Sequence, residues 1–389
     1  MKRIALFCDG TWNSAEMAHP TNVRQLSKMV TPEDAEGNRQ VIGYFEGVGA
    51  RETDNWFSRQ IDKLGGGAFG WGLTENLKEA YTFLAENYDP GDEVYIFGFS
   101  RGAYTARSLA GLIRNCGIPG YDEMGSVPDA IELYRRRDDD SKPDDMPSLR
   151  FRADFSPRVA TSETDKETRD NPGECVLYNT RYLGIWDTVG ALGVPSHLTR
   201  LSSIFNRKYQ FHDTDLSRSV FAARHAVAID ERRRTFIPTL WNNVDTLNSL
   251  SVETPARYEQ LWFPGTHGTV GGGGPRRGIS EATMYWVGVG ARNQGLHFND
   301  EFEARRESID PSEFLDNKPG KPGLLTRLMA LDSADRQNLK DPSDVAWLTR
   351  RRFHLSDLPD GAPYNPPTLS HVQSVLRQDG PPGDDKIDA

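Results

Sequence analysis

The chain has few cysteines, no long apolar run and no excess of basic residues. Its 389 residues include three cysteines, Cys8, Cys116 and Cys175, which are too far apart to predict a disulfide framework or a metal site. No stretch approaches the roughly 18 apolar residues that a membrane-spanning helix requires. A net charge of −10 provides no basic face for phosphate backbones, so a nucleic-acid-binding protein is excluded.

The first residues do not have the pattern that predicts a signal peptide. Two basic residues precede an apolar run that begins at Ile4, but this run ends at Asp9 and no small-residue cleavage site follows. We therefore interpret the run as a buried β-strand. Together with the sparse cysteines, this start predicts a protein that folds in the cytoplasm.

Short apolar runs alternate with amphipathic patterns along most of the chain. Strands are predicted at residues 4–8, 41–45, 93–99, 182–186 and 260–263. Helices are predicted at residues 73–87, 101–113, 217–230 and 282–290. This alternation predicts an α/β fold of three layers, with a mostly parallel sheet flanked by helices.

Two regions depart from this alternation. Residues 138–174 are acidic, polar and rich in turn residues, which predicts an exposed polar excursion. The chain after about residue 358 is rich in proline, aspartate and glycine. We expect one domain over residues 1–330 and a C-terminal extension over residues 331–389 that is partly loop or disordered.

The most informative motif is G-x-S-x-G, formed by Gly98, Ser100 and Gly102. An apolar strand precedes it and a helix follows it, which is the context of a nucleophile on a sharp strand-to-helix turn. Glycines at the flanking positions prevent collisions between the turn, the strand and the helix. We predict that Ser100 is a nucleophile.

A serine nucleophile requires a base and a carboxylate that orients the base. In this fold they follow the serine in the order acid, then histidine, each after a later strand. Asp187 directly follows the strand at residues 182–186, and His267 follows the strand at residues 260–263. His297 is the alternative base, and His225 is interpreted as a packing histidine within a helix.

The loop after the first strand is the candidate for the rest of the site. The backbone N–H groups of Thr11 and Arg101 are predicted to form the oxyanion hole, with Gly10 and Trp12 contacting substrate. Phosphotransferases with Asp-Gly-Thr after a strand need a nucleophilic aspartate two positions earlier, where this chain has Phe7. A phosphotransferase of that type is therefore excluded.

No pattern in the sequence predicts a metal or a cofactor. Gly65, Gly67 and Gly70 match G-x-G-x-x-G, but no strand precedes them, so a dinucleotide site is not supported.

Several blocks of the sequence resemble one known family. The blocks are Phe-Cys-Asp-Gly-Thr-Trp-Asn at residues 7–13, Gly-Phe-Ser-Arg-Gly-Ala-Tyr-Thr-Ala-Arg at 98–107, Gly-Ile-Trp-Asp-Thr-Val-Gly-Ala at 184–191, Ala-Val-Ala-Ile-Asp-Glu-Arg-Arg at 226–233 and Trp-Phe-Pro-Gly-Thr-His at 262–267. Together they resemble the family DUF2235, which includes the catalytic domain of type VI secretion phospholipase effectors. The resemblance extends from about residue 3 to about residue 300.

The resemblance implies an α/β-hydrolase with a Ser100–Asp187–His267 triad that cleaves acyl esters of phospholipids. It also implies export by a specialised secretion system. The chain departs from the family at Thr269, where the family usually has an aspartate two residues after the histidine.

The sequence thus predicts a serine hydrolase that cleaves carboxylic esters through an acyl-enzyme. The substrate is a small-molecule or lipid ester, which leaves peripheral contact with a membrane open. The alternatives are a thioesterase or other acyl hydrolase of a soluble substrate, and a non-catalytic interaction protein on the same scaffold. The sequence does not define an oligomeric state.

Overall fold

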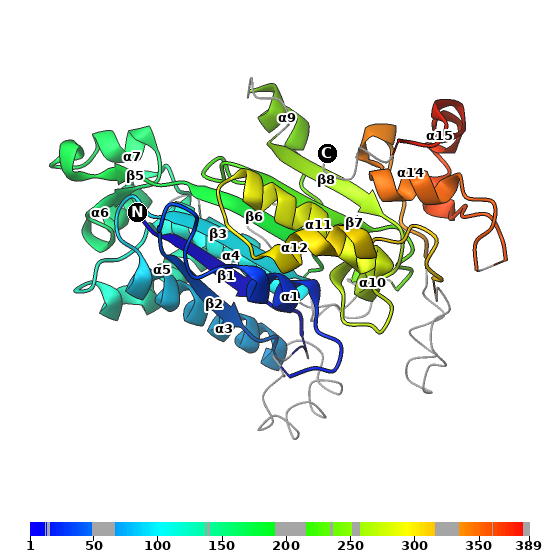
Figure 1. The fold of residues 1–389 in the computed structure, drawn as a ribbon. Coiled ribbons are helices and arrows are strands. Elements are labelled where there is room, and N and C mark those ends of the chain that lie inside the picture. The colour runs from blue at the N-terminus through cyan, green and yellow to red at the C-terminus, as the bar shows by residue number, and fades with distance from the viewer. Residues whose placement is uncertain are drawn as a thin grey trace.

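The centre of the molecule is a six-stranded parallel sheet. The computed structural model describes residues 1–11, 13, 16–48, 67–136, 138, 141–190, 215–233, 236–250, 257–315, 334–359 and 361–383. The sheet has the strand order β2-β1-β3-β6-β7-β8, and all of its pairings are parallel (Figure 1). Its strands are β1 (Arg3–Cys8), β2 (Gln40–Phe45), β3 (Glu93–Phe99), β6 (Thr180–Trp186), β7 (Ala223–Ala228) and β8 (Tyr258–Phe263).

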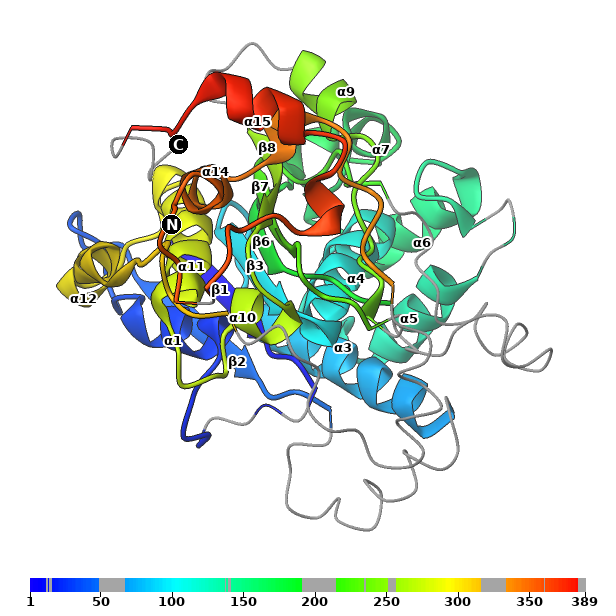
Figure 2. The same ribbon diagram turned by 90° about the vertical axis from the view of Figure 1, so that its right-hand side faces the viewer.

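Helices cover both faces of this sheet. One face packs against α1 (Asn22–Met29) and α11 (Gly278–Asn293), with α12 (Asp300–Ala304) outside them. The opposite face packs against α3 (Gly67–Asn87) and α4 (Arg101–Cys116), and α5 (Val127–Arg135) packs on these two helices. Figure 2 shows the sheet between these two helical layers. The predicted three-layer α/β fold is therefore confirmed.

Shorter elements complete the described chain. A second sheet pairs β4 (Val159–Ala160) with β5 (Val176–Leu177). The remaining α-helices are α6 (Met146–Phe155), α7 (Glu163–Glu167), α9 (Val244–Ser249), α10 (His267–Gly271), α14 (Trp347–Phe353) and α15 (Gln373–Asp379). Single turns of 3₁₀-helix occur at Met124–Ser126, Pro172–Glu174, Arg305–Ser308, Pro342–Asp344 and Pro367–Leu369.

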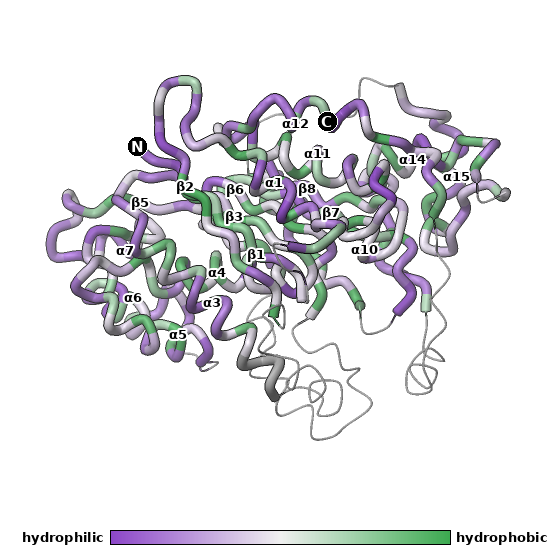
Figure 3. Tube along the Cα trace, turned by 60° about the horizontal axis from the view of Figure 1, so that its bottom comes forward, coloured by the Kyte–Doolittle hydropathy of each residue, from purple (hydrophilic) through white to green (hydrophobic). Residues whose placement is uncertain are grey.

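The apolar strands form because both faces of the sheet are covered. Every residue of β1 is buried, as is every residue of β7. A strand buried on both faces has a continuous apolar sequence rather than an alternating one. Figure 3 shows hydrophobic colouring concentrated in the central strands and hydrophilic colouring on the outer segments. No helix in the described part of the chain has both the length and the apolar character to cross a bilayer.

The strand order reverses between β1 and β3. From β1 the chain passes through α1 to β2 on one side, and then through α3 to β3 on the other side of β1. Ligands of open parallel sheets bind where the order reverses in this way, beyond the carboxyl ends of the strands. The fold therefore predicts a ligand site at the loops that follow β1 and β3.

The predicted helix at residues 217–230 is wrong, because this segment contains β7. The strand has the sequence Ala-Arg-His-Ala-Val-Ala, and all six residues are buried between β6 and β8. A short, fully buried segment has no periodicity that separates a strand from a helix, and its alanines favour the helix. His225 consequently lies in the sheet.

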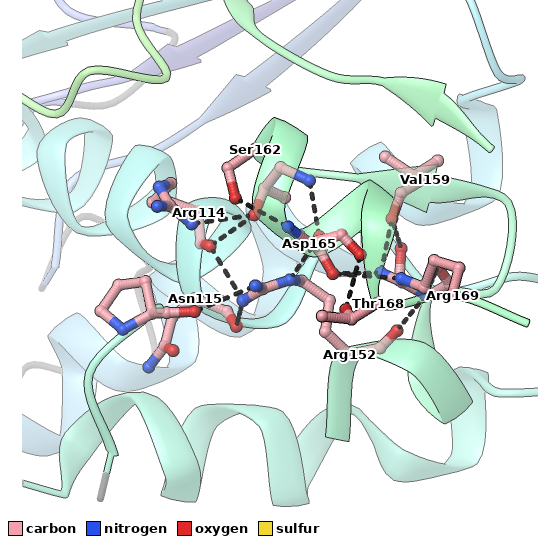
Figure 4. A network of polar contacts seen from close by, with 12 residues as sticks. Arg114, Asn115, Arg152, Val159, Ser162, Asp165, Thr168 and Arg169 are labelled. Atoms are coloured by element: carbon pink, nitrogen blue, oxygen red, sulfur yellow. Dashed lines mark hydrogen bonds and ion pairs between the residues drawn. The ribbon is translucent and has the colours of Figure 1, made fainter. Parts of the chain in front are cut away.

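The region predicted as an exposed polar excursion packs around a buried ionic network. Arg152 of α6 and Arg169 both bind the Asp165 carboxylate, at Nε–Oδ distances of 2.7 and 3.0 Å (Figure 4). Arg152 also donates to the carbonyl of Asn115 at 2.6 Å, which links this region to the end of α4. Charged groups therefore stabilise a segment whose apolar content is low.

The described part of the predicted C-terminal extension packs beside β8. The Thr349 hydroxyl donates to the carbonyl of Trp262 at 2.7 Å, and the N–H of Ala346 donates to the same carbonyl at 3.1 Å. Leu348, Leu369 and other apolar residues of this segment join the hydrophobic cluster of β7, β8 and α11. Apolar residues from 334–359 and 361–383 therefore share the core of the sheet, and the division near residue 330 stays a prediction.

The ionic network predicts a large effect of one carboxylate on stability. Asp165→Ala leaves two buried guanidinium groups without their shared anion, so the free energy of unfolding should fall by about 3–5 kcal/mol. The control is Asp144→Ala, which removes an exposed partner of Arg114 and should cost less than about 1 kcal/mol. Urea denaturation followed by circular dichroism measures both, and equal losses would contradict a stabilising role of the network.

Candidate active site

Ser100 lies on a strained turn between β3 and α4. Its backbone has φ 58° and ψ −118°, a conformation that costs energy for a residue with a side chain. Glycines make this turn possible. A Cβ on Gly98 would overlap the backbone of α4 at Ala103, and a Cβ on Gly102 would overlap the Cys8 and Asp9 carbonyls at the end of β1. The turn therefore presents the Ser100 hydroxyl at the carboxyl edge of the sheet.

The structure brings the three predicted residues Ser100, His267 and Asp187 into one line of hydrogen bonds. His267 Nε2 lies 2.7 Å from Ser100 Oγ, and His267 Nδ1 lies 2.6 Å from Asp187 Oδ2. An ionised carboxylate can only accept, so Nδ1 carries the proton and Nε2 accepts from the serine hydroxyl. All three residues are buried. This arrangement can remove a proton from Ser100.

His267 begins the short helix α10, directly after the loop that follows β8. Its imidazole lies between the rings of Phe99 and Phe236, at centroid distances of 4.7 and 4.6 Å. Gly271 permits this packing, because a Cβ there would overlap the Phe99 ring. Thr269, at the position of the family aspartate, pairs with the Thr266 hydroxyl at 3.1 Å.

The loop after β7 fixes the loop that carries His267. The Asp230 carboxylate accepts from the Gly265 N–H at 2.6 Å, and the Glu231 carboxylate accepts from the His267 N–H at 3.3 Å. Arg233 holds Glu231 through two side-chain hydrogen bonds of 2.8 and 2.7 Å. Sequence reasoning assigned no role to Asp230 or Glu231, although both belong to the family block at residues 226–233.

Arg336 is the functional-site residue that sequence reasoning missed. Its guanidinium contacts both oxygens of Asp187, with Nη1–Oδ1 2.6 Å and Nη2–Oδ2 3.0 Å. Nothing in the local sequence around residue 336 marks it, because its partner is 149 positions away. Burial alone would raise the pKa of Asp187, but the Arg336 guanidinium and the His267 hydrogen bond hold it far below its usual range.

Other histidines of the described chain do not contact Ser100. His225 accepts from the Thr188 N–H at 3.2 Å and donates to Gln260 at 3.0 Å. Burial lowers the pKa of His225 to about 3, so it is a neutral packing residue in β7. His297, the alternative base, bonds through its backbone to Gln40 at the opposite end of the sheet. His197 and His212 lie outside the described residues.

The pKa of His267 itself is lowered. Burial is the largest cause, and it outweighs the opposing effects of the hydrogen bond and charge of Asp187. A lowered pKa keeps the imidazole neutral, and therefore able to accept a proton, under mildly acidic conditions.

The loop after β1 lies against the serine. A Cβ on Gly10 would be 3.3 Å from Ser100 Cβ, so these two backbones approach closely. The Asp9 carboxylate holds the loop by accepting from the Gly10 N–H at 2.6 Å and the Tyr44 hydroxyl at 2.7 Å. Thr11 follows Gly10 in this loop. Its role in the oxyanion hole stays a prediction.

The remaining predicted site residues are Arg101 and Trp12. Arg101 is the first residue of α4, and its role as the second N–H donor is also a prediction. Trp12 lies outside the described residues. Within the described ranges, no group of three or more His, Cys, Asp or Glu side chains could hold a metal ion.

The sequence matches the model of a known protein family. A sequence model described as "T6SS, Phospholipase effector Tle1-like, catalytic domain" matches residues 2–288. The uncharacterized protein YEL023C of Saccharomyces cerevisiae is 29% identical over 248 residues, which cover 60% of this chain and 32% of that protein. The chain therefore spans about a third of the length of this relative.

Two solved structures are similar to this chain at low sequence identity. The Tle1 effector bound to the VgrG spike of the Type 6 secretion system is 18% identical with a TM-score of 0.36, and the match covers 71% of this chain and 52% of that one. An uncharacterized protein from Pseudomonas aeruginosa is 17% identical with a TM-score of 0.43, and the match covers 99% of this chain and 60% of that one.

The close packing at the serine turn predicts contrasting effects of two glycine substitutions. Gly102→Ala forces a methyl group into the backbone of β1, so the free energy of unfolding should fall by about 3 kcal/mol or more. Gly268→Ala places its methyl group in open space on α10 and should change stability by no more than about 1 kcal/mol. Thermal and urea unfolding test both, and a neutral Gly102→Ala would contradict the close approach of α4 to β1.

Proposed function

We propose that this chain, which belongs to the family of Tle1-like phospholipase effector catalytic domains, is a serine hydrolase of carboxylic esters. Family membership supports a lipase- or esterase-like hydrolase. The observation that carries the proposal is the continuous line of hydrogen bonds from Ser100 through His267 to Asp187. This line activates a hydroxyl that would otherwise be a weak nucleophile.

In the proposed reaction Ser100 Oγ attacks the acyl carbonyl carbon while His267 Nε2 accepts the hydroxyl proton. Asp187 keeps Nδ1 protonated and stabilises the imidazolium that forms. The backbone N–H groups of Thr11 and Arg101 stabilise the oxyanion. His267 then donates its proton to the leaving alcohol oxygen as the ester C–O bond breaks. His267 then takes a proton from water, whose oxygen attacks the acyl-enzyme carbonyl carbon. The bond from that carbon to Ser100 Oγ breaks as His267 returns the proton to Oγ, which releases the carboxylic acid and restores Ser100.

The proposed substrate is an ester with an apolar acyl group. Aromatic rings of Phe99 and Phe236 border the imidazole, and Ile237, which follows Phe236 in the chain, is 62% exposed. Such side chains favour an acyl chain over a polar substrate. The family favours phospholipids as the source of that chain, and it also supports export through a type VI secretion system. The net charge of −10 favours uncharged or zwitterionic lipids over anionic ones.

Covalent labelling tests the nucleophile. A fluorophosphonate should label the wild type at Ser100 and should not label Ser100→Ala, because only an activated serine reacts. Ser108→Ala, which removes a buried serine of the same helix, should be labelled like the wild type. Hydrolysis of p-nitrophenyl butyrate should fall by about a million-fold in Ser100→Ala. Equal labelling of the wild type and Ser100→Ala would overturn the assignment and favour a non-catalytic interaction protein.

A substrate panel tests the acyl group. Release of fatty acid from phosphatidylcholine vesicles, dependent on Ser100, supports a phospholipase. Activity on p-nitrophenyl butyrate without any release from vesicles would remove the lipase and leave an esterase of soluble substrates. Faster turnover of acyl thioesters than of the matched oxygen esters would instead identify a thioesterase.

The lowered pKa of His267 predicts the pH dependence of the reaction. The base must be neutral, so activity is lost as pH falls through the pKa of His267, which lies below its ordinary value of 6.5. The dependence of kcat/KM on pH with p-nitrophenyl butyrate should therefore have an acidic midpoint below 6.5. A midpoint above this value would show that Asp187 outweighs burial at His267.

A further inference from the structure

Arg336 reaches the active site from outside the segment that the family model matches. That match ends at residue 288, whereas Arg336 precedes the buried Leu339 in the C-terminal part of the chain. Its guanidinium binds both oxygens of Asp187, which is fully buried. The orienting carboxylate therefore has two side-chain partners, His267 and Arg336.

The position of Arg336 is fixed independently of Asp187. Its Nη1 donates to the carbonyl of Ala228 at 2.6 Å, and its Nη2 donates to the carbonyl of Phe236 at 2.7 Å. The preceding residues are attached to the loop after β7, since the N–H of Ala334 donates to the carbonyl of Arg232 at 2.9 Å. Arg232 also pairs with Asp335 at 2.9 Å. These contacts fix the position of the guanidinium, so it can fix the position of the Asp187 carboxylate in turn.

We propose that Arg336 is a positioning residue that orients Asp187 and limits how strongly this carboxylate stabilises protonated His267. The proposal rests on the proposed serine hydrolase function and deepens it. Three hydrogen bonds fix the carboxylate besides the one to His267, two from Arg336 and one from the Ala228 N–H at 2.9 Å. These contacts fix the direction in which Asp187 Oδ2 accepts the hydrogen bond from His267 Nδ1.

The charge of Arg336 has a second consequence for the base. Besides Asp187, the charged groups near His267 are Glu231, which favours its protonated form, and Arg336, which opposes it. His225 is neutral, and the charges that act on it are those of Arg107, Asp187 and Arg336. Asp230 bonds to Gly265 and Tyr364, and the charges that act on it are those of Arg352 and Arg336. Arg336 shares the negative charge of Asp187, so its removal leaves His267 as the only side chain bound to that carboxylate, beside the Ala228 N–H. The imidazole should then become more basic.

Three variants test the proposal. Arg336→Met removes the charge and both hydrogen bonds, and Arg336→Lys keeps a charge without the planar fork. Arg352→Met is the control, because Arg352 is another buried arginine of the same segment that binds the Pro311 and Glu313 carbonyls, each at 2.7 Å. The readouts are the rate of fluorophosphonate labelling of Ser100 as a function of pH, the titration of His267 by NMR, and thermal unfolding.

Arg336→Met should shift the acidic midpoint of the labelling rate upward by about one pH unit. Its maximal rate should fall by about 100-fold, because the carboxylate loses its fixed direction. Arg336→Lys should keep the midpoint close to that of the wild type and recover part of the rate. Arg352→Met should lower thermal stability without moving the midpoint. A purely structural role of Arg336 would lower stability in the same way and leave the midpoint unchanged.

Midpoints and maximal rates of Arg336→Met and Arg336→Lys equal to those of the wild type would overturn the proposal. If Arg336→Met does not fold, Arg336→Lys decides, and a wild-type rate in that variant rejects the orienting role. A wild type that is not labelled at all would reject the proposed function instead. In that case the titration of His267 still decides whether Arg336 acts on the imidazole.

Discussion

The site depends on the burial of one charge, the carboxylate of Asp187. This group is inaccessible to solvent, and an ionised carboxylate in such a position is costly unless it is paired and hydrogen-bonded. Its partners come from separate parts of the chain, with the Ala228 N–H at the end of β7, His267 after β8, and Arg336 near the C-terminus. Satisfying this one carboxylate therefore assembles the loops after β6, β7 and β8 with the C-terminal segment.

Backbone strain is concentrated at the same place. Ser100 and Asp187 are the two non-glycine residues in the described chain with positive φ, at 58° and 37°. Each directly follows a central strand, and the strands are in register, since Phe99 pairs with Trp186. The Ser100 N–H donates to the Trp186 carbonyl at 3.0 Å, so the sheet extends its hydrogen bonding into the turn. The rigid sheet thus supplies the energy that holds both residues in strained conformations.

The parts of the site that could be predicted from sequence are those whose signal is local. Ser100 lies in a strand–glycine–helix pattern, and Asp187 and His267 each follow a strand in the expected order. The sequence predicts a helix where β7 lies, because burial on both faces removes the periodicity that identifies a strand. Arg336 carries no local signal at all, since only the folded chain reveals what a buried guanidinium contacts.

Buried arginines stabilise several polar regions of this molecule. Apolar residues make up 37% of the chain, yet segments predicted to be exposed are packed. Arg152 holds the region around α6 and α7 through Asp165 and the Asn115 carbonyl, and Arg352 holds α14 to the Pro311 carbonyl. Each guanidinium offers five donors in a fixed plane, which suits the joining of several carbonyls and carboxylates at once. Arg336 has the same chemistry, but the carboxylate that it binds also holds His267. The same chemistry that elsewhere compensates for missing apolar contacts is therefore proposed, at Arg336, to act on His267 through Asp187.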